Sequence, residues 1–443
     1  MARYEVSDGS SHKFWEITLV GKTFTVRWGR IGSRGQQTIK HFTDDATARA
    51  EYDKLVAEKR RKGYKLVHGT EEPDARRRAS AAAAPSGLRN PDLEHAVTSD
   101  PNDEAALLVL ADWLQTHGDP RGELIALHRA LKHEKDPKLF LDRKRAAEAH
   151  LAAHEPALLG PLYDRRHLFR LEWQLGFIRT ARVSFDAARD DDPEMATVIG
   201  DLVDAPVALA MQELTLGMIS AAAFAGAPDP SAGRYQAVLE ELARRAAPRS
   251  LHTLFFGDFW PGTKAPERRA MLGDLSTVIP AFPLLRKVVV DGGVLAYHEA
   301  ALPELRHFEH RAPIDDATFG WLLASKFPNL EHLSLDVGMA LVDLTQLFDR
   351  FPRLKTLRLF RTAGTDLLVE ELARSKFLAQ LEVLDLADGN LSDTGAARLV
   401  ELSPRYRHLK TFHLGFQQLT YGATKRLREK TGIKVNDPRM YGN

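Results

Sequence analysis

A recurring apolar spacing is the feature of this sequence that most restricts its fold. From about residue 168 onward, units of the form Leu-x-x-Leu-x-Leu return along the chain, with conservative replacements. The units are LFRLEW (168), MQELTL (211), LHTLFF (251), LRKVVV (285), LRHFEH (305), LEHLSL (330), LKTLRL (354), LEVLDL (381) and LKTFHL (409). The last five intervals are 20, 25, 24, 27 and 28 residues. A period of this length predicts stacked units, each of which buries one face against the next.

The spacing and the period resemble those of leucine-rich repeats. The resemblance implies that residues 161–443 form an α/β leucine-rich-repeat solenoid, with a parallel sheet on its concave face and helices outside. The first three intervals of 43, 40 and 34 residues are long, which predicts insertions or an undetected repeat. LRHFEH is the weakest unit, because His310 replaces the final leucine.

The first 68 residues have a different pattern. Residues 14–20 and 22–28 alternate with the period of two that is typical of half-buried strands, and residues 36–42 predict a third strand. Thr43, Asp44 and Asp45 are candidate N-caps for a helix that runs to about Arg61. This order predicts a small sheet with one helix.

The run from Phe14 to Val67 resembles a WGR domain, the module named for a tripeptide that is Trp28-Gly29-Arg30 in this chain. The resemblance covers about residues 3–68, and we assign residues 1–68 to this domain. It implies an antiparallel sheet packed with one helix. In the WGR domains of poly(ADP-ribose) polymerases the module contacts DNA near a strand end. The resemblance therefore implies that Trp28 stacks on a terminal ribose and that Arg30 joins DNA to protein.

Three glycines, Gly29, Gly32 and Gly35, follow the second predicted strand. A dinucleotide loop needs G-x-G-x-x-G before a helix, and a P-loop needs Gly-Lys-Ser/Thr. A strand follows here instead, so the glycines predict a turn in which φ is positive.

Basic residues surround this turn. Residues 1–70 contain 14 Lys and Arg against 8 Asp and Glu, whereas the whole chain has a net charge of +1. The candidate nucleic-acid-binding residues are Arg27, Trp28, Gly29, Arg30, Arg34 and Lys40, the cations serving as phosphate contacts. A solvated basic face is the alternative. Trp28 shares strand parity with Phe24 and Val26, so both a core position and a contact position remain open.

Two segments separate the head from the repeats. Residues 69–90 are rich in Ala, Pro, Ser, Gly and Arg, which predicts a flexible linker. Residues 91–160 predict helices, with Asp103 or Asn102 as the first cap and Asp119-Pro120 opening the next helix. The stretch LADWLQTHGDPRGELIALHRAL (110–131) resembles a short helical companion module that precedes repeat arrays in some bacterial proteins. That resemblance implies no activity.

The predicted concave face offers a second surface. Its candidate partner-binding residues are Phe255, Lys287, His332, Arg358, Phe360, Asp385 and His413. A nucleic-acid track would be dominated by Lys and Arg, whereas this set mixes signs and includes aromatic residues. The set favours a protein ligand. A face without any single ligand is the alternative.

Several classes of chemistry have no support in the sequence. The chain has no cysteine, which excludes disulfides, thiol catalysis and zinc sites built on sulfur. His128 and His133 are five residues apart and His307 and His310 three apart, so neither pair is spaced as metal ligands on one face. We therefore expect no enzymatic activity, no cofactor and no metal.

The longest uncharged apolar stretch, residues 214–227, is shorter than the roughly 20 residues that span a bilayer. We expect a cytoplasmic protein without a membrane partner.

Together these features predict a multidomain α+β adaptor that binds DNA, or a partner associated with nucleic acid, through its head and a protein through its repeats. The alternative is a scaffold or regulatory subunit of a bacterial signalling or defence complex, in which both ends bind proteins.

Overall fold

The structure is a computed structural model of the chain. It describes residues 2–435 apart from 9–10, 21, 32, 34, 43–44, 69–87, 101, 186–193, 218–234, 246–249, 258–269, 272–281, 283, 294–298 and 339–341. The chain divides into two compact units, Met1–Ala84 and Pro85–Asn443. Most of the predicted linker, 69–90, lies outside the described residues.

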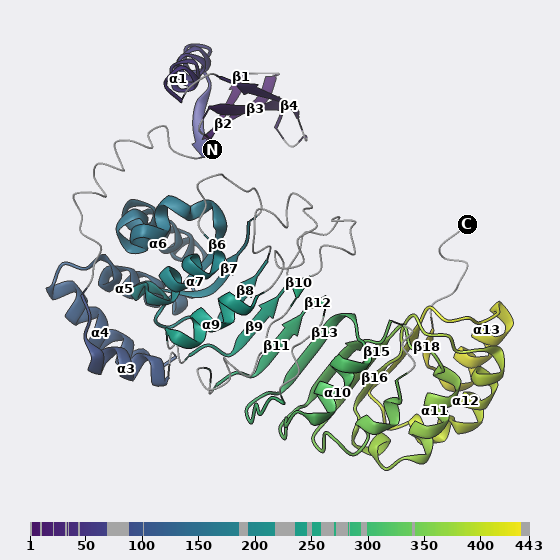
Figure 1. The fold of residues 1–443 in the computed structure, drawn as a ribbon. Helices are drawn as coiled ribbons and strands as arrows, with labels where there is room; N and C mark the ends of the chain where they lie inside the picture. Colours follow the sequence, from purple (N-terminus) through teal and green to yellow (C-terminus); the bar gives the residue numbers. More distant parts are fainter. Residues whose placement is uncertain are drawn as a thin grey trace. The chain divides into compact units, whose positions relative to one another are not determined.

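The N-terminal unit is an antiparallel sheet with one helix, as the sequence predicts (Figure 1). Its elements are β1 (Ala2–Asp8), β2 (Ser11–Val20), β3 (Thr23–Arg30), β4 (Gln36–His41), α1 (Asp45–Arg61) and β5 (Lys65–His68). The sheet order is β4-β3-β2-β1-β5. The strand β1, which pairs along its whole length with β2, has no counterpart among the predicted strands.

One face of this sheet carries the core of the unit. Tyr4, Trp15 and Ile17 from the sheet pack with Tyr52 and Val56 of α1 in one buried cluster. Tyr52 and Val56 are four residues apart, so they lie one above the other on a single face of the helix. The helix therefore covers the strand positions that share the parity of Trp15.

The second unit begins with four helices. They are α3 (Pro91–Ser99), α4 (Glu104–Thr116), α5 (Pro120–Lys132) and α6 (Pro137–Leu159), followed by the 3-10 helix η1 (Gly160–Leu168). Asp103 caps α4 through the amides of Ala105 and Ala106. Asp119 caps α5 and also holds the buried guanidinium of Arg121, with Arg121 Nη2 2.7 Å from Asp119 Oδ2. This pair gives the Gly-Asp-Pro-Arg-Gly stretch a structural role.

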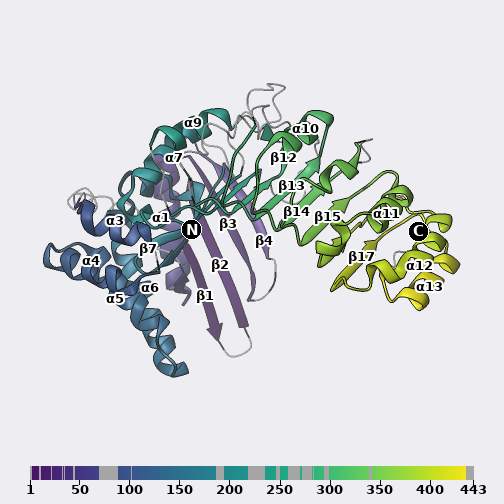
Figure 2. The same cartoon turned by 90° about the horizontal axis from the view of Figure 1, so that it is seen from below.

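An eleven-stranded sheet follows. Its strands are β6 (Phe169–Gln174), β7 (Phe177–Val183), β8 (Glu213–Leu216), β9 (Thr253–Phe256), β11 (Lys287–Val290), β13 (His307–Pro313), β14 (His332–Asp336), β15 (Thr356–Phe360), β16 (Val383–Asp385), β17 (Thr411–Gly415) and β18 (Lys434–Val435). They lie side by side in chain order (Figure 1, Figure 2). From β7 to β18 every neighbouring pair is parallel. A separate parallel pair joins β10 (Ala270–Met271) and β12 (Gly292–Gly293).

The prediction of a wholly parallel sheet is wrong at its first strand. The LFRLEW unit contributes β6, which runs antiparallel to β7. Leu175 and Gly176 connect the two strands, with φ of 48° and 80°. Two positive φ values are those of a type I′ hairpin turn. Leucine is not the residue expected at such a position, so this hairpin could not be predicted from residue types. The result is a mixed sheet.

Helices line this sheet. They are α7 (Met195–Asp204), α9 (Gln236–Arg244), α10 (Asp316–Ala324), α11 (Thr365–Arg374), α12 (Asp393–Tyr406) and α13 (Tyr421–Thr431), with short 3-10 helices η2 (Pro206–Ala208), η6 (Leu344–Leu347) and η7 (Phe377–Gln380). None of the helices in the described part of the chain is long and apolar enough to cross a membrane.

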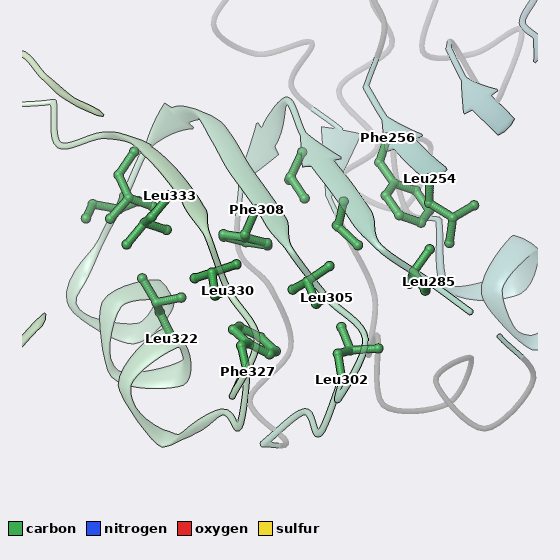
Figure 3. Packing of buried hydrophobic residues seen from close by; sticks show 14 of the residues in the cluster. Leu254, Phe256, Leu285, Leu302, Leu305, Phe308, Leu322, Phe327, Leu330 and Leu333 are labelled. Atoms are coloured by element: carbon green, nitrogen blue, oxygen red, sulfur yellow. The ribbon is translucent and has the colours of Figure 1, made fainter. Parts of the chain in front are cut away.

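The recurring apolar residues form one core between strands and helices. Leu254, Phe308 and Leu333 project from their strands into the same layer as Leu322 of α10 (Figure 3). His310 occupies the position of a repeat leucine and is only 1% exposed. Its Nδ1 donates to the carbonyl of Ala312 at 2.7 Å, which satisfies part of its polarity.

The Leu-x-x-Leu-x-Leu units thus mark strand positions correctly. The interpretation of residues 161–443 as a leucine-rich-repeat solenoid, and of 91–160 as a companion module, stays a prediction.

Candidate nucleic-acid interface

An open pocket of about 500 Å³ lies on the N-terminal unit, beside the Trp-Gly-Arg tripeptide. We call it the Trp28 pocket. It is lined by Lys13, Phe14, Trp28, Gly29, Arg30, Ser33, Gly35, Gln36, Lys59 and Tyr64. Three of these residues are cations and three are aromatic, and no carboxylate is among them.

Strand pairing explains how the pocket assembles. In the antiparallel register of β2 and β3, Lys13 lies directly opposite Arg30 and Trp15 lies directly opposite Trp28. Residues directly opposite one another share a face of the sheet, and so do residues two apart on one strand. Lys13, Arg30 and Trp28 therefore lie on the same face, the one that α1 covers further along the strands.

Trp28 occupies the margin of the core. Only 2% of Trp15 is exposed, whereas 37% of Trp28 is exposed. The sequence left open whether Trp28 lies in the core or at a surface that contacts DNA. Its parity is that of the core residues Phe24 and Val26, but it lies where the cover of α1 ends. Its exposed side chain is one of those that line the pocket.

The end of α1 closes one side of the pocket with a cation. The Lys59 ammonium lies 5.5 Å from the Trp15 ring and 5.4 Å from the Tyr64 ring. Burial lowers the pKa of Lys59, and the neighbouring Lys62 lowers it further. The two aromatic rings hold this ammonium in place, where it can contact an anion that binds in the pocket.

The glycines shape the turn that forms the pocket wall. A Cβ on Gly29 would lie 2.8 Å from the Cα of Gly35. Gly35 has a φ of 70°, and a Cβ there would lie 2.6 Å from both Phe14 Cζ and the Trp28 carbonyl oxygen. The Ser33 hydroxyl donates to the Arg30 carbonyl at 2.8 Å. The turn joins two antiparallel strands, as predicted. Gly32 and Arg34 lie outside the described residues, so nothing tests the predicted phosphate contact of Arg34.

Arg27 lies on the other face of the sheet. Its Nε donates to Glu16 Oε2 at 2.7 Å, and Arg3 Nη1 donates to Glu16 Oε1 at 2.8 Å. The hydrogen bond from Arg27 holds the pKa of Glu16 below its usual value, although burial opposes it; Arg3 lowers this pKa further. The Arg27 guanidinium also lies 5.5 Å from the Phe14 ring. Arg27 thus has structural partners and does not line the Trp28 pocket.

Lys40 lies on the same face as Trp28 but not in the pocket. It pairs with Phe24 in the register of β3 and β4, whereas Trp28 pairs with Gln36. Its ammonium lies 5.9 Å from the Phe24 ring. Of the six candidate residues, the structure therefore brings Trp28, Gly29 and Arg30 together.

Lys13, Lys59 and Tyr64 also line the pocket, although no sequence motif singled them out as site residues. The pairing of β2 with β3 carries the signal for Lys13, because it is directly opposite Arg30. Tyr64 could not be placed from sequence, because its position depends on the turn after α1.

The candidate partner-binding residues of the second unit share one face of the large sheet. Buried residues such as Leu254 and Leu359 alternate with them along the strands. Phe255, Arg358, Asp385 and His413 belong to one in-register row that crosses β9 to β17. Lys287 and His332 belong to the adjacent row, and Phe360 pairs with Asp336 in a third.

We call the face of the large sheet that carries these candidate residues the row face. Several charged or polar side chains on it already have partners. His413 Nδ1 lies 3.1 Å from Asp385 Oδ1. Hydrogen bonds from His307 and from Arg311 lower the pKa of Glu309 to about 2, against the effect of its burial. The Arg311 guanidinium lies 4.6 Å from the Phe255 ring. In the described part of the chain, no group of three or more His, Asp or Glu side chains could hold a metal ion.

Comparison with known proteins identifies the N-terminal unit. Residues 1–71 match the family model of the WGR domain. Protein YehF of Escherichia coli is 41% identical over 64 residues, which are 14% of this chain and 23% of that protein. The uncharacterized protein YfeS of Escherichia coli is 37% identical over 62 residues, 14% of this chain and 25% of that protein. This chain thus spans about a quarter of the length of these relatives.

A solved structure resembles the chain along most of its length. It is a crystal structure of a protein from Bacteroides fragilis, which matches with a TM-score of 0.51 and 20% identity. The match covers 99% of this chain and 96% of that one. At this level of identity the likeness concerns the fold alone.

Proposed function

We propose that the WGR domain at the N-terminus of this chain binds DNA through the Trp28 pocket. The observation that carries the proposal is the convergence of Lys13, Arg30 and Lys59 around the exposed side of Trp28. Three cations suit consecutive phosphates, and an open aromatic face suits a sugar or a base.

The position of Lys13 directly opposite Arg30 favours a DNA-binding role over an ordinary solvated face. Like charges directly opposite one another in a sheet are unfavourable. No carboxylate of the described residues lines the pocket to offset them. The opposite face of the sheet has the arrangement expected for stability, since Arg27 pairs with Glu16 and Arg3 pairs with both Glu16 and Glu5. A polyanion bound in the pocket would relieve the repulsion.

We further propose that the whole protein is a non-enzymatic cytoplasmic adaptor. In this proposal the repeat-bearing sheet recruits a protein. The mixture of charged, polar and aromatic side chains on the row face supports such a ligand. Phe255 and Phe360 are apolar anchors among charged and polar neighbours, which is typical of protein interfaces.

The DNA proposal is tested by fluorescence anisotropy of the full chain with labelled nicked, blunt-ended and single-stranded DNA. At about 50 mM salt we expect binding to at least one form, with a logarithmic salt slope of about −0.9 per neutralised phosphate on duplex DNA. Undetectable binding to all three forms would refute it.

A second candidate function makes the WGR domain a protein-docking module. The row face favours a protein partner at the other end of the chain, so both ends would then bind proteins. A pull-down that is unchanged by nuclease and by Arg30→Ala would support this function and contradict DNA tethering.

A further inference from the structure

A second basic pocket lies in the other unit, at the end of the large sheet. It has a volume of about 270 Å³. The last turns of α12 and α13 and the strands β17 and β18 surround it. Its lining includes Tyr406, Arg407, Lys410, Phe412, Lys430 and Lys434. We call it the Lys430 pocket.

Four cations line this pocket: Arg407, Lys410, Lys430 and Lys434. No carboxylate is among the lining residues. Lys410 is held by Glu382, with Nζ 2.7 Å from Oε2. Within the part of the chain that the structure describes, the other three cations form no ion pair.

The negative C-terminal ends of the neighbouring helices do not neutralise the positive charge of this pocket. The helices α12 and α13 both end at the pocket, where Arg407 and Gly432 are their C-caps. Each helix C-terminus carries the equivalent of about half a negative charge. Those two ends and the Glu382 carboxylate balance only part of the four cations, which leaves a surplus of about two positive charges.

The floor of the pocket is fixed before any ligand binds. Tyr406 is buried, donates its hydroxyl hydrogen to the carbonyl of Val369, and stacks on Phe412 with ring centroids 5.0 Å apart. The Thr431 hydroxyl is already used, since it donates to the Leu427 carbonyl at 2.6 Å. The hydroxyls of Ser403 and Thr411 add donors beside the cations.

We propose that the Lys430 pocket binds the phosphate groups of a small phosphorylated molecule. Arg407, Lys430 and Lys434 supply the charge, and Lys410 stays anchored to Glu382. The surplus of about two charges suits a phosphate or a diphosphate. The volume lies below the range of about 300–1,000 Å³ typical of sites for larger ligands, so the site takes the anionic group and little else.

Isothermal titration calorimetry of the full chain with inorganic pyrophosphate, at constant ionic strength, tests the proposal. We expect saturable binding that Lys430→Ala weakens by about tenfold or more, since a charged hydrogen bond is lost. Lys425→Ala is the matched control, because it removes the same charge from the same helix outside the pocket. The pyrophosphate affinity of the Lys425→Ala variant is expected to equal that of the unsubstituted chain. Lys430 and Lys425 are both exposed, so neither change should disturb folding.

Two results would overturn the proposal. One is the absence of saturable binding at about 10 mM pyrophosphate, beyond which affinity is too weak for a specific site. The other is equal affinity in Lys430→Ala and Lys425→Ala. The variant Arg30→Glu separates the two basic pockets of the chain, because a loss of pyrophosphate binding in that variant alone would assign the site to the Trp28 pocket.

Discussion

Trp15 and Trp28 lie directly opposite each other on β2 and β3, yet only Trp28 is open to solvent. The same face of the sheet thus supplies both the core under α1 and a wall of the Trp28 pocket. The two tryptophans are expected to respond differently to substitution.

Trp28→Ala should reduce DNA affinity more than it reduces stability. A stacked base is worth about 1–3 kcal/mol, so a loss of roughly 5- to 150-fold is expected. Trp15→Ala should instead destabilise the unit by about 3–5 kcal/mol, as expected for a buried tryptophan. Anisotropy titrations and hydrogen exchange of β1–β4 in the full chain measure the two effects. Equal destabilisation by both variants would place Trp28 in the core.

Glu16 should make the stability of the N-terminal unit depend on pH. Because Arg27 and Arg3 hold the folded pKa of Glu16 below its ordinary value of 4.5, this stabilisation is complete above that value and is lost as the pH falls through the folded pKa. Glu16→Gln should therefore cost about 1–2 kcal/mol at neutral pH and progressively less in acid.

Hydrogen exchange of the β2 amides in both proteins, followed from pH 7 to about pH 3, measures this difference. A difference in stability between the two proteins that stays constant over that pH range would mean that the ion pairs do not stabilise the fold.

Gly35→Ala should disturb the turn beside the Trp28 pocket more than a positive φ alone explains. Gly63 has a φ of 83° and its nearest atom to an added Cβ is Val6 Cγ2 at 3.9 Å, so Gly63→Ala isolates the conformational cost of about 1 kcal/mol. Gly35→Ala adds the clash with Phe14 and Trp28 and should cost at least about 2 kcal/mol more. Urea-dependent hydrogen exchange measures the free energy of unfolding of the N-terminal unit in the two variants. A similar loss of stability in both would show that the turn at Gly35 can relax.

Asp119→Asn should destabilise the helices of the second unit strongly. Asparagine caps a helix about as well as aspartate, but here it would leave the charge of Arg121 buried without its partner. We expect a loss of about 3–5 kcal/mol. Asp103→Asn changes an exposed cap of the neighbouring helix and should cost only a few tenths of a kcal/mol. Thermal denaturation of both variants checks the contrast, which would vanish if the buried pair were dispensable.

Much of the fold was accessible from the sequence because its apolar residues repeat with clear periods. Alternation located β2, β3 and β4, and the leucine spacing located nine of the eleven strands of the large sheet, all except β7 and β18. The hairpin at Leu175 and Gly176 was not accessible, because leucine is unusual in the backbone conformation that this turn requires.

The candidate site was predicted only in part. The tripeptide pointed to Trp28, Gly29 and Arg30, which do meet in one pocket. Alternation along one strand already places Arg27 and Arg30 on opposite faces, because they are three residues apart. The ion pair of Arg27 with Glu16 was not accessible from the sequence, since it depends on the register of β2 and β3. The exposure of Trp28 depends on where α1 stops covering the sheet, which alternation along one strand does not reveal.

In the proposed function the residues of the Trp28 pocket, rather than the general positive charge of the domain, bind DNA. A comparison of Arg30→Glu with Lys22→Glu in DNA titrations of the full chain tests this distinction. Lys22 is exposed at the turn between β2 and β3, at the far end of these strands from Arg30. Both variants change the net charge equally.

We predict that Arg30→Glu lowers the affinity by about tenfold or more and makes the salt slope shallower by about one unit, whereas Lys22→Glu changes both only slightly. Equal losses of DNA affinity in the two variants, or wild-type affinity in both, would show that the Trp28 pocket is not the DNA-binding site.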